Sequence, residues 1–174
     1  MCSGNGTNFE NIVRTCKEDE VVVMVHNKKK CGAQKRADRL GIPNCHISSK
    51  NEELIIDVMK AWKVDLIILA GWMKIITPKL IEAFPKRIIN VHPSLLPKYK
   101  GLNAVEQALD NKDDVTGCTV HFVTEELDSG EIILQAEVPI LPEDDVTTLT
   151  KAIQRREYHI LPEAIQYVKH KIQK

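Results

Sequence analysis

Ile88-Ile89-Asn90-Val91-His92-Pro93-Ser94-Leu95-Leu96-Pro97 joins an apolar strand to a proline-bounded turn. Asn90 and His92 are two residues apart, and side chains at that spacing point to the same face of a strand. Pro93 and Pro97 keep the following residues from continuing as a helix. The two polar side chains are therefore expected to stand together where the strand ends, which is where open α/β sheets bind ligands. An Asn and a His that only satisfy backbone groups in a loop would give the same pattern, so other parts of the chain must distinguish the two interpretations.

The composition of the chain excludes several broad classes of function. The 174 residues suit one domain with one sizeable core. The 24 basic and 24 acidic side chains cancel, so no overall field favours nucleic acid or an anionic membrane. The longest apolar run, residues 66–73, is too short to span a bilayer, and no secretory signal is recognisable. The five cysteines are widely spaced without a C-x-x-C pair, which is typical of reduced thiols in a cytoplasmic protein rather than of a disulfide framework or a zinc site.

Strands and helices alternate along the chain, which predicts a mostly parallel, Rossmann-like α/β sheet with helices on both faces and an antiparallel addition near the C-terminus. The predicted strands are residues 21–25, 42–47, 64–70, 87–91, 117–123 and 131–138. Four of the predicted helices are residues 31–40, 52–62, 78–84 and 103–109. A further helix begins at Thr7, and a long C-terminal one is capped by Asp144 or Asp145, interrupted near Pro162 and ends near Lys169.

A glycine-rich turn, Ser3-Gly4-Asn5-Gly6-Thr7-Asn8, leads into the first predicted helix. Thr7 and Glu10 have capping-box spacing, so the helix is predicted to begin at Thr7. Such a loop presents free N–H groups and the positive end of a helix dipole, which suits an anion, although a plain, well-capped turn would look the same. Met1 and Cys2 are too few to supply a central strand of about five residues ahead of this loop. We therefore expect the first central strand to be missing and the chain to be truncated at its N-terminus.

A third polar group lies on a later predicted strand and in the turn after it. Thr119 and His121 share one face of the strand, and Asp128 lies in the turn. Asn90, His92 and Asp128 offer an amide, an imidazole and a carboxylate, and no Ser or Cys stands in a nucleophile-elbow context. The trio suits group transfer between two bound substrates, with His92 as acid, base or oxyanion partner, Asn90 as amide donor and Asp128 holding the imidazole charged. A metal site made of His92, His121 and Asp128 is the competing interpretation, which no ligand spacing selects.

Together these segments resemble the phosphoribosylglycinamide formyltransferases, a family of folate-dependent enzymes of purine biosynthesis. The resemblance is carried, in the family's order, by residues 3–8, 69–73, 89–97, 117–130 and 132–135. The Asn-x-His-Pro-Ser-Leu-Leu-Pro pattern is shared with other formyltetrahydrofolate enzymes, whereas the Ser-Gly-Asn-Gly-Thr-Asn loop is specific to the glycinamide ribonucleotide branch. The resemblance extends over nearly the whole chain and implies a single formyltransferase domain over residues 1–174.

The resemblance also implies a reaction and its residues. A formyl group passes from 10-formyltetrahydrofolate, the co-substrate, to the amine of 5-phosphoribosylglycinamide by direct attack, without a metal. Asn90, His92 and Asp128 match the catalytic trio of the family. The positions that match the ribonucleotide site are Gly6, Thr7, Asn8, Gln154 and Glu157. The positions that match the folate site are Met73, Lys74, Ile75, Ile76 and Asn90.

Two positions depart from the usual pattern of the family. Lys74 stands where most members have Arg, and Lys100 replaces the proline before Gly101, which predicts a looser loop there. Three alternatives stay open: a tRNA-directed formyltransferase, a formyltetrahydrofolate hydrolase, and a non-catalytic truncated relic that binds folate or nucleotide. The zero net charge and the lack of a basic C-terminal domain argue against the tRNA-directed enzyme. We expect small-molecule substrates, no nucleic-acid or membrane partner, a cytoplasmic location, and a monomer or a homodimer.

Overall fold

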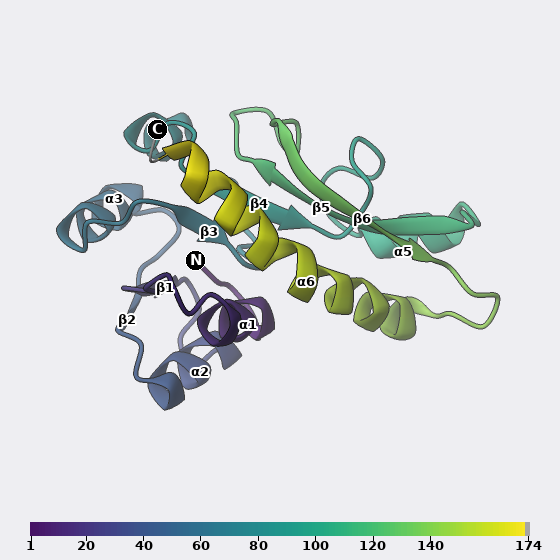
Figure 1. Cartoon of the computed structure of the whole chain (residues 1–174), viewed down its shortest axis with the longest axis horizontal. Helices are drawn as coiled ribbons and strands as arrows, with labels where there is room; N and C mark the ends of the chain where they lie inside the picture. Colours follow the sequence, from purple (N-terminus) through teal and green to yellow (C-terminus); the bar gives the residue numbers. More distant parts are fainter. Residues whose placement is uncertain (173–174) are drawn as a thin grey trace. The chain divides into compact units, whose positions relative to one another are not determined.

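The computed structural model describes residues 1–172, and the chain forms two compact units, Met1–Ile89 and Asn90–Lys174 (Figure 1). Helices and strands alternate in the first unit, and the second unit places an antiparallel pair of strands before a long helix. The mixed α/β architecture predicted from the sequence is confirmed. Within the described residues, no helix is long and apolar enough to cross a membrane.

The first unit is built from short strands and the helices between them. It contains α1 (Thr7–Thr15), β1 (Met24–His26), α2 (Gly32–Leu40), β2 (Asn44–His46), α3 (Glu52–Ala61), β3 (Ile67–Leu69), α4 (Pro78–Ala83) and the beginning of β4 (Ile88–His92). β1 and β2 pair in parallel, with Met24 opposite Asn44 and His26 opposite His46. β3 lies beside the beginning of β4. Phe9 of α1 and Met24 of β1 belong to one buried apolar cluster, which joins the helix to the strands.

Residues 1–3 lie beside β1 and β3, in the place of the central strand that was expected to be missing. Cys2 N donates to Val25 O at 2.9 Å on one side, and Ala70 N donates to Met1 O at 3.0 Å on the other. Backbone groups of Val25 and Ala70 are therefore paired with residues 1–2, where Cys2 forms an isolated bridge with His26. The pairing extends over few residues, and β1 and β3 are accordingly shorter than predicted, at three residues each.

The second unit combines an antiparallel strand pair with the longest helix of the described chain. It contains the end of β4, α5 (Ala104–Asp110), β5 (Val115–Phe122), β6 (Ile132–Pro139) and α6 (Val146–Ile172). The end of β4 lies beside β5, and β5 pairs with β6 in antiparallel register, with Val115 opposite Pro139. This pairing confirms the predicted antiparallel addition near the C-terminus. α6 packs against β5 and β6 and buries a face that includes Leu149, Ile153 and Leu161.

The ends and the middle of α6 test two sequence predictions. Thr148 N donates to Asp145 Oδ1 at 2.8 Å, and Asp145 N donates to Thr148 Oγ1 at 2.9 Å, so Asp145 caps the helix as predicted. Pro162 lies inside the helix, and the prediction that it interrupts the helix is wrong. A proline costs an exposed helix about 3 kcal/mol. Leu161 and Ala164 beside it are fully buried, and this packing holds the turn in helical form.

Candidate active site

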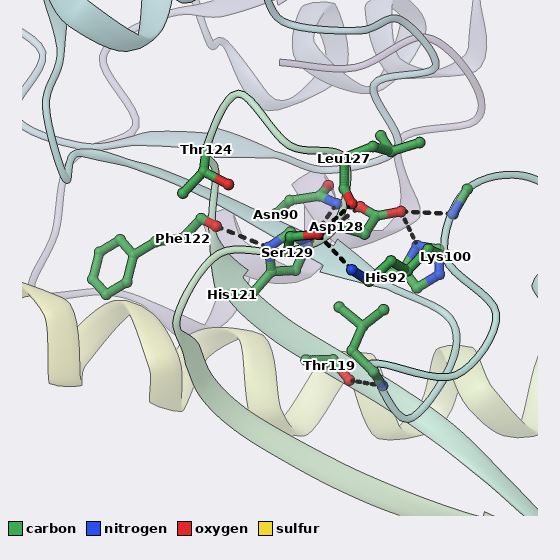
Figure 2. Close-up of polar contacts among 12 residues, drawn as sticks. Asn90, His92, Lys100, Thr119, His121, Phe122, Thr124, Leu127, Asp128 and Ser129 are labelled. Carbon is green, nitrogen blue, oxygen red and sulfur yellow. Dashed lines mark hydrogen bonds and ion pairs between the residues drawn. The ribbon is translucent and has the colours of Figure 1, made fainter.

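Asn90, His92 and Asp128 come from two segments of the second unit that meet at the end of β4 (Figure 2). β4 carries Asn90 and His92 at alternate positions, and the turn after β5 carries Asp128. His92 Nδ1 lies 3.4 Å from Asp128 Oδ2, and the two side chains are nearly buried, at 6% and 7% exposed. Buried charges are screened much less by salt and water than exposed ones. His92 and Asp128 therefore face each other where the charge of the carboxylate is only weakly screened.

His121 of β5 links Asn90 to Asp128 (Figure 2). His121 Nε2 lies 3.2 Å from Asn90 Nδ2 and 3.5 Å from Asp128 Oδ1. Sequence reasoning considered His121 only as a metal ligand. Its partners Asn90 and Asp128 lie on other segments, so the alternation along β5 gave no signal for this contact. Within residues 1–172, no group of three or more His, Cys, Asp or Glu is arranged to hold a metal ion.

Backbone carbonyls locate one proton on each histidine. His92 Nε2 is 2.8 Å from Tyr99 O, and a carbonyl oxygen only accepts, so this nitrogen carries a hydrogen. His121 Nδ1 is 2.9 Å from Phe122 O and carries a hydrogen for the same reason. The other nitrogen of His92, Nδ1, faces the Asp128 carboxylate. The other nitrogen of His121, Nε2, lies between the Asp128 carboxylate, which accepts, and the Asn90 amide nitrogen, which donates. Whether Nε2 carries a hydrogen therefore decides which of these two groups it bonds to.

Asp128 is held as a carboxylate by its surroundings. Burial acts to raise its pKa, but hydrogen bonds from His121 and from Gly101 N together with the charge of His92 hold the pKa below its ordinary value. Gly101 N lies 2.8 Å from Asp128 Oδ2. The backbone φ of Asp128 is 48°, a left-handed conformation that residues with a Cβ rarely adopt and that local bonds must stabilise. The side chain is therefore both ionised at neutral pH and fixed in direction.

Lys100 connects the segment after β4 to the turn that carries Asp128 (Figure 2). Lys100 Nζ donates to Ser129 Oγ at 2.5 Å and lies 3.5 Å from Glu126 Oε1. Gly101, the next residue, bonds to Asp128 through its backbone. Lysine in place of proline was expected to loosen this loop, whereas the structure gives it a side-chain link to the opposite turn.

Thr119 of β5 fixes the turn that follows β4. Its Oγ1 donates to Ser94 O at 2.7 Å and accepts from Leu96 N at 3.1 Å. Gln135 Nε2 donates to the same oxygen at 2.9 Å. The buried hydroxyl thus supports the proline-bounded turn beside His92, a role that sequence reasoning missed because its partners are distant in the chain.

The glycine-rich loop lies in the first unit and leads into α1, which begins at Thr7 as predicted. Gly6 precedes the helix with φ 75°, and in the described chain no side chain caps it. The predicted capping box is wrong because the Glu10 carboxylate bonds to Arg14 and to arginines of α2 instead. The first N–H groups of a helix have no intrahelical acceptors. With no side-chain cap, these donors and the positive end of the helix dipole suit an anion.

The segment after β3, also in the first unit, combines exposed and buried apolar side chains. Met73 and Ile75 are 64% and 74% exposed, whereas Ile76 is buried. Lys74 is exposed as well. Met73 N donates to Ser3 Oγ at 2.9 Å, and Ser3 directly precedes the glycine-rich loop. The segment after β3 and the start of the glycine-rich loop, which the resemblance assigns to two different substrates, therefore lie side by side.

Gln154 and Glu157 lie on α6 in the second unit. Burial and the charge of nearby Glu157 raise the pKa of Cys118 to about 12, so this thiol is no nucleophile near neutral pH.

An open groove of about 550 Å³ also borders α6, and its lining includes the basic side chains of Lys151 and Arg155. Neither Gln154 nor Glu157 lines this groove. The two residues are thus held on a different element from the cluster around His92.

Comparisons with known proteins give a consistent result. A family model for formyl transferases matches residues 1–165. The chain is 40% identical to phosphoribosylglycinamide formyltransferase of Haemophilus influenzae, over 96% of this chain and 84% of that protein. It is 37% identical to the human trifunctional purine biosynthetic protein adenosine-3, over 97% of this chain but only 18% of that much longer protein.

Two solved structures are closely similar. Glycinamide ribonucleotide transformylase 1 from Symbiobacterium toebii superimposes with a TM-score of 0.93 at 39% identity, covering 97% of this chain and 85% of that one. Phosphoribosylglycinamide formyltransferase from Anaplasma phagocytophilum superimposes with a TM-score of 0.94 at 36% identity, covering 98% of this chain and 85% of that one.

Proposed function

The chain belongs to the formyl transferase family, and we propose that Asn90, His92 and Asp128 perform its reaction. The reaction transfers a formyl group from 10-formyltetrahydrofolate to the amine of 5-phosphoribosylglycinamide, a step of purine biosynthesis. The observation that carries the residue assignment is the distance of 3.4 Å between His92 Nδ1 and Asp128 Oδ2. A cation held beside an amide is what a reaction that passes through an oxyanion needs.

The proposed chemistry begins with attack of the amine on the formyl carbon. A C–N bond forms, and the formyl oxygen becomes an oxyanion. The His92 imidazolium and an N–H of the Asn90 amide stabilise that charge, and burial of His92 strengthens the interaction. Collapse of the intermediate breaks the bond to the folate nitrogen, which receives the proton that the attacking amine loses. Loss of one oxyanion donor costs other enzymes on the order of a hundredfold or more in rate.

The geometry of His92 favours an electrostatic role over direct proton transfer. Its Nε2–H donates to Tyr99 O at 2.8 Å, and its Nδ1 faces Asp128. Both nitrogens are thus engaged with protein oxygens, and a proton transfer through either one requires that one of these contacts be exchanged. We therefore propose that His92 carries the positive charge and that the Asp128 carboxylate stabilises it.

We further propose two substrate sites. The ribonucleotide site consists of Gly6, Thr7, Asn8, Gln154 and Glu157. The folate site consists of Met73, Lys74, Ile75, Ile76 and Asn90. The N–H donors at the start of α1 support the first proposal, because they suit the phosphate of the ribonucleotide. The exposed apolar side chains of Met73 and Ile75 support the second, because pockets for organic cofactors are mostly apolar.

The proposal extends to the organisation of the protein. We propose that residues 1–174 act as a single formyltransferase domain, because the family model covers residues of both compact units. We also propose a cytoplasmic monomer or homodimer that acts on small molecules, uses no metal, and has no nucleic-acid or membrane partner. Size-exclusion chromatography with light scattering distinguishes the monomer from the homodimer.

The reaction is tested by following folate absorbance with phosphoribosylglycinamide as acceptor. We expect turnover by the protein of residues 1–174 and a loss of about a hundredfold or more in His92→Ala. His170→Ala, which changes an exposed histidine of α6, is the matched control and should keep full activity. Parallel reactions with tRNA and with no acceptor test the transfer to tRNA and hydrolysis. An inactive parent chain, or equal activity in His92→Ala and His170→Ala, would contradict the proposal.

A further inference from the structure

Among the described residues, three arginines surround the carboxylate of Glu10 in α1. Arg14 Nη2 lies 2.8 Å from Glu10 Oε1, and Arg39 Nη2 lies 2.7 Å from Glu10 Oε2. Arg36 Nη1 bonds to the same carboxylate. Hydrogen bonds from Arg14 first and Arg36 second lower the pKa of Glu10 to about 2. Glu10 is therefore ionised at neutral pH, and the group as a whole remains positively charged.

Arg36 differs from the other two arginines because it also reaches the glycine-rich loop. Arg36 Nε donates to Asn5 O at 2.8 Å. A peptide group is planar, so the position of the Asn5 oxygen determines where the N–H of Gly6 points, on the opposite side of the same plane. A charged donor on the oxygen also polarises the peptide group and makes its N–H a better donor. Arg36 thus acts on the N–H group of Gly6, although Arg36 itself lies on α2 and not in the loop.

The rest of α2 supports the same loop through direct backbone contact. Ala33 N donates to Gly4 O at 3.1 Å. A Cβ on Gly6 would lie 2.6 Å from Ala33 Cα, and a Cβ on Gly32 would lie 2.9 Å from Asn5 Cα. Side chains at either glycine would therefore push the loop and the helix apart. The loop is held in one conformation before any ligand arrives, and such preorganisation lowers the cost of binding.

We propose that Arg36 is the positioning residue of the glycine-rich loop and that it sets the affinity of this loop for a phosphate monoester dianion. The inference rests on the proposed function, because it takes the phosphate of the ribonucleotide as the ligand. It adds a residue outside the loop, on a different helix, to those that determine phosphate affinity. Arg36 acts there through the Asn5 carbonyl and, at longer range, through its charge.

The experiment compares Arg36→Met and Arg36→Lys with Arg39→Met in steady-state kinetics. Arg39 is the matched control, because it contacts Glu10 from the same helix, and in the described chain it makes no hydrogen bond to the loop. For Arg36→Met we expect a rise of about tenfold in KM for the ribonucleotide, the factor for one lost charge-assisted hydrogen bond. We expect kcat and KM for the folate to stay within about twofold in all three variants, with Arg36→Lys between Arg36→Met and the parent.

Inorganic phosphate separates this inference from the proposed function. Calorimetric titration with phosphate alone should show weaker binding by Arg36→Met than by Arg39→Met, at equal thermal stability of the two variants. An equal rise in KM in both methionine variants, or a fall in kcat with unchanged KM, would overturn the positioning role. If the parent chain binds phosphate but transfers no formyl group, the proposed function fails while the titration still decides the role of Arg36.

Discussion

Asp128 is the residue on which the charge of the cluster depends, because it faces His92 and His121 at once. Asp128→Asn keeps the size of the side chain and an acceptor for Gly101 N, but it removes the negative charge. We expect kcat to fall on the order of a hundredfold or more, because the negative charge that faces His92 Nδ1 at 3.4 Å is then lost. Formyl-transfer kinetics from pH 5 to 9 measure the effect, with Asp110→Asn on the exposed end of α5 as control. An unchanged kcat and pH profile in Asp128→Asn would show that His92 does not need the carboxylate.

Local spacing explains which site residues the sequence reveals. Asn90 and His92 are two residues apart on a strand, and this alone predicts that they share a face. The roles of His121 and Thr119 depend on the register between β4, β5 and the turn after β4, which no local pattern encodes. Arg36 is hidden for the same reason, since its loop partner lies 31 positions away in the chain.

At the scale of elements, the side chain of Lys100 links two loops of the second unit. Lys100 Nζ donates to Ser129 Oγ, and Asp128 lies in the turn that this bond restrains. We expect Lys100→Ala and Ser129→Ala each to lower kcat by up to about fivefold, since exposed links are worth about 1 kcal/mol or less. Lys100→Ala also removes the contact with Glu126 at 3.5 Å, so the double variant should lose no more than Lys100→Ala alone, in which the bond to Ser129 is already absent. Lys98→Ala, whose parent side chain bonds to Asp113 at 3.2 Å instead, is the control. Additive losses, or an equal loss in the control, would contradict a shared role.

The helices α1 and α6 show two places where tertiary contacts override the local preference of the sequence. Thr7 and Glu10 have the spacing of a capping box, but Glu10 finds stronger partners in the arginines and leaves the helix start uncapped. Pro162 should end a helix, yet the buried residues around it keep α6 continuous. In both cases the sequence predicts the element correctly, and tertiary contacts decide its detail.

At the scale of the whole molecule, both compact units carry segments that the proposed function uses. The first unit carries the glycine-rich loop and the segment at Met73, and the second unit carries Asn90, His92 and Asp128. Each segment that carries the resemblance is continuous in sequence, so the resemblance can be recognised without the fold. The pairing of residues 1–3 with both β1 and β3 is different, because it depends on segments that are far apart in the chain.

Each unit also contains a carboxylate whose pKa is lowered on folding, Glu10 in the first and Asp128 in the second. A lowered folded-state pKa contributes stability that is present above the ordinary pKa and is lost as the pH falls through the folded-state value. For Glu10 these values are 4.5 and about 2, so we expect the Tm to fall as the pH is lowered through this window. Thermal melts followed by circular dichroism measure this slope. Glu10→Gln should flatten it, because the group no longer titrates, whereas Glu106→Gln on the exposed face of α5 should keep it. If Glu10→Gln keeps the slope of the parent chain, the arginine cluster is not the source of its acid sensitivity.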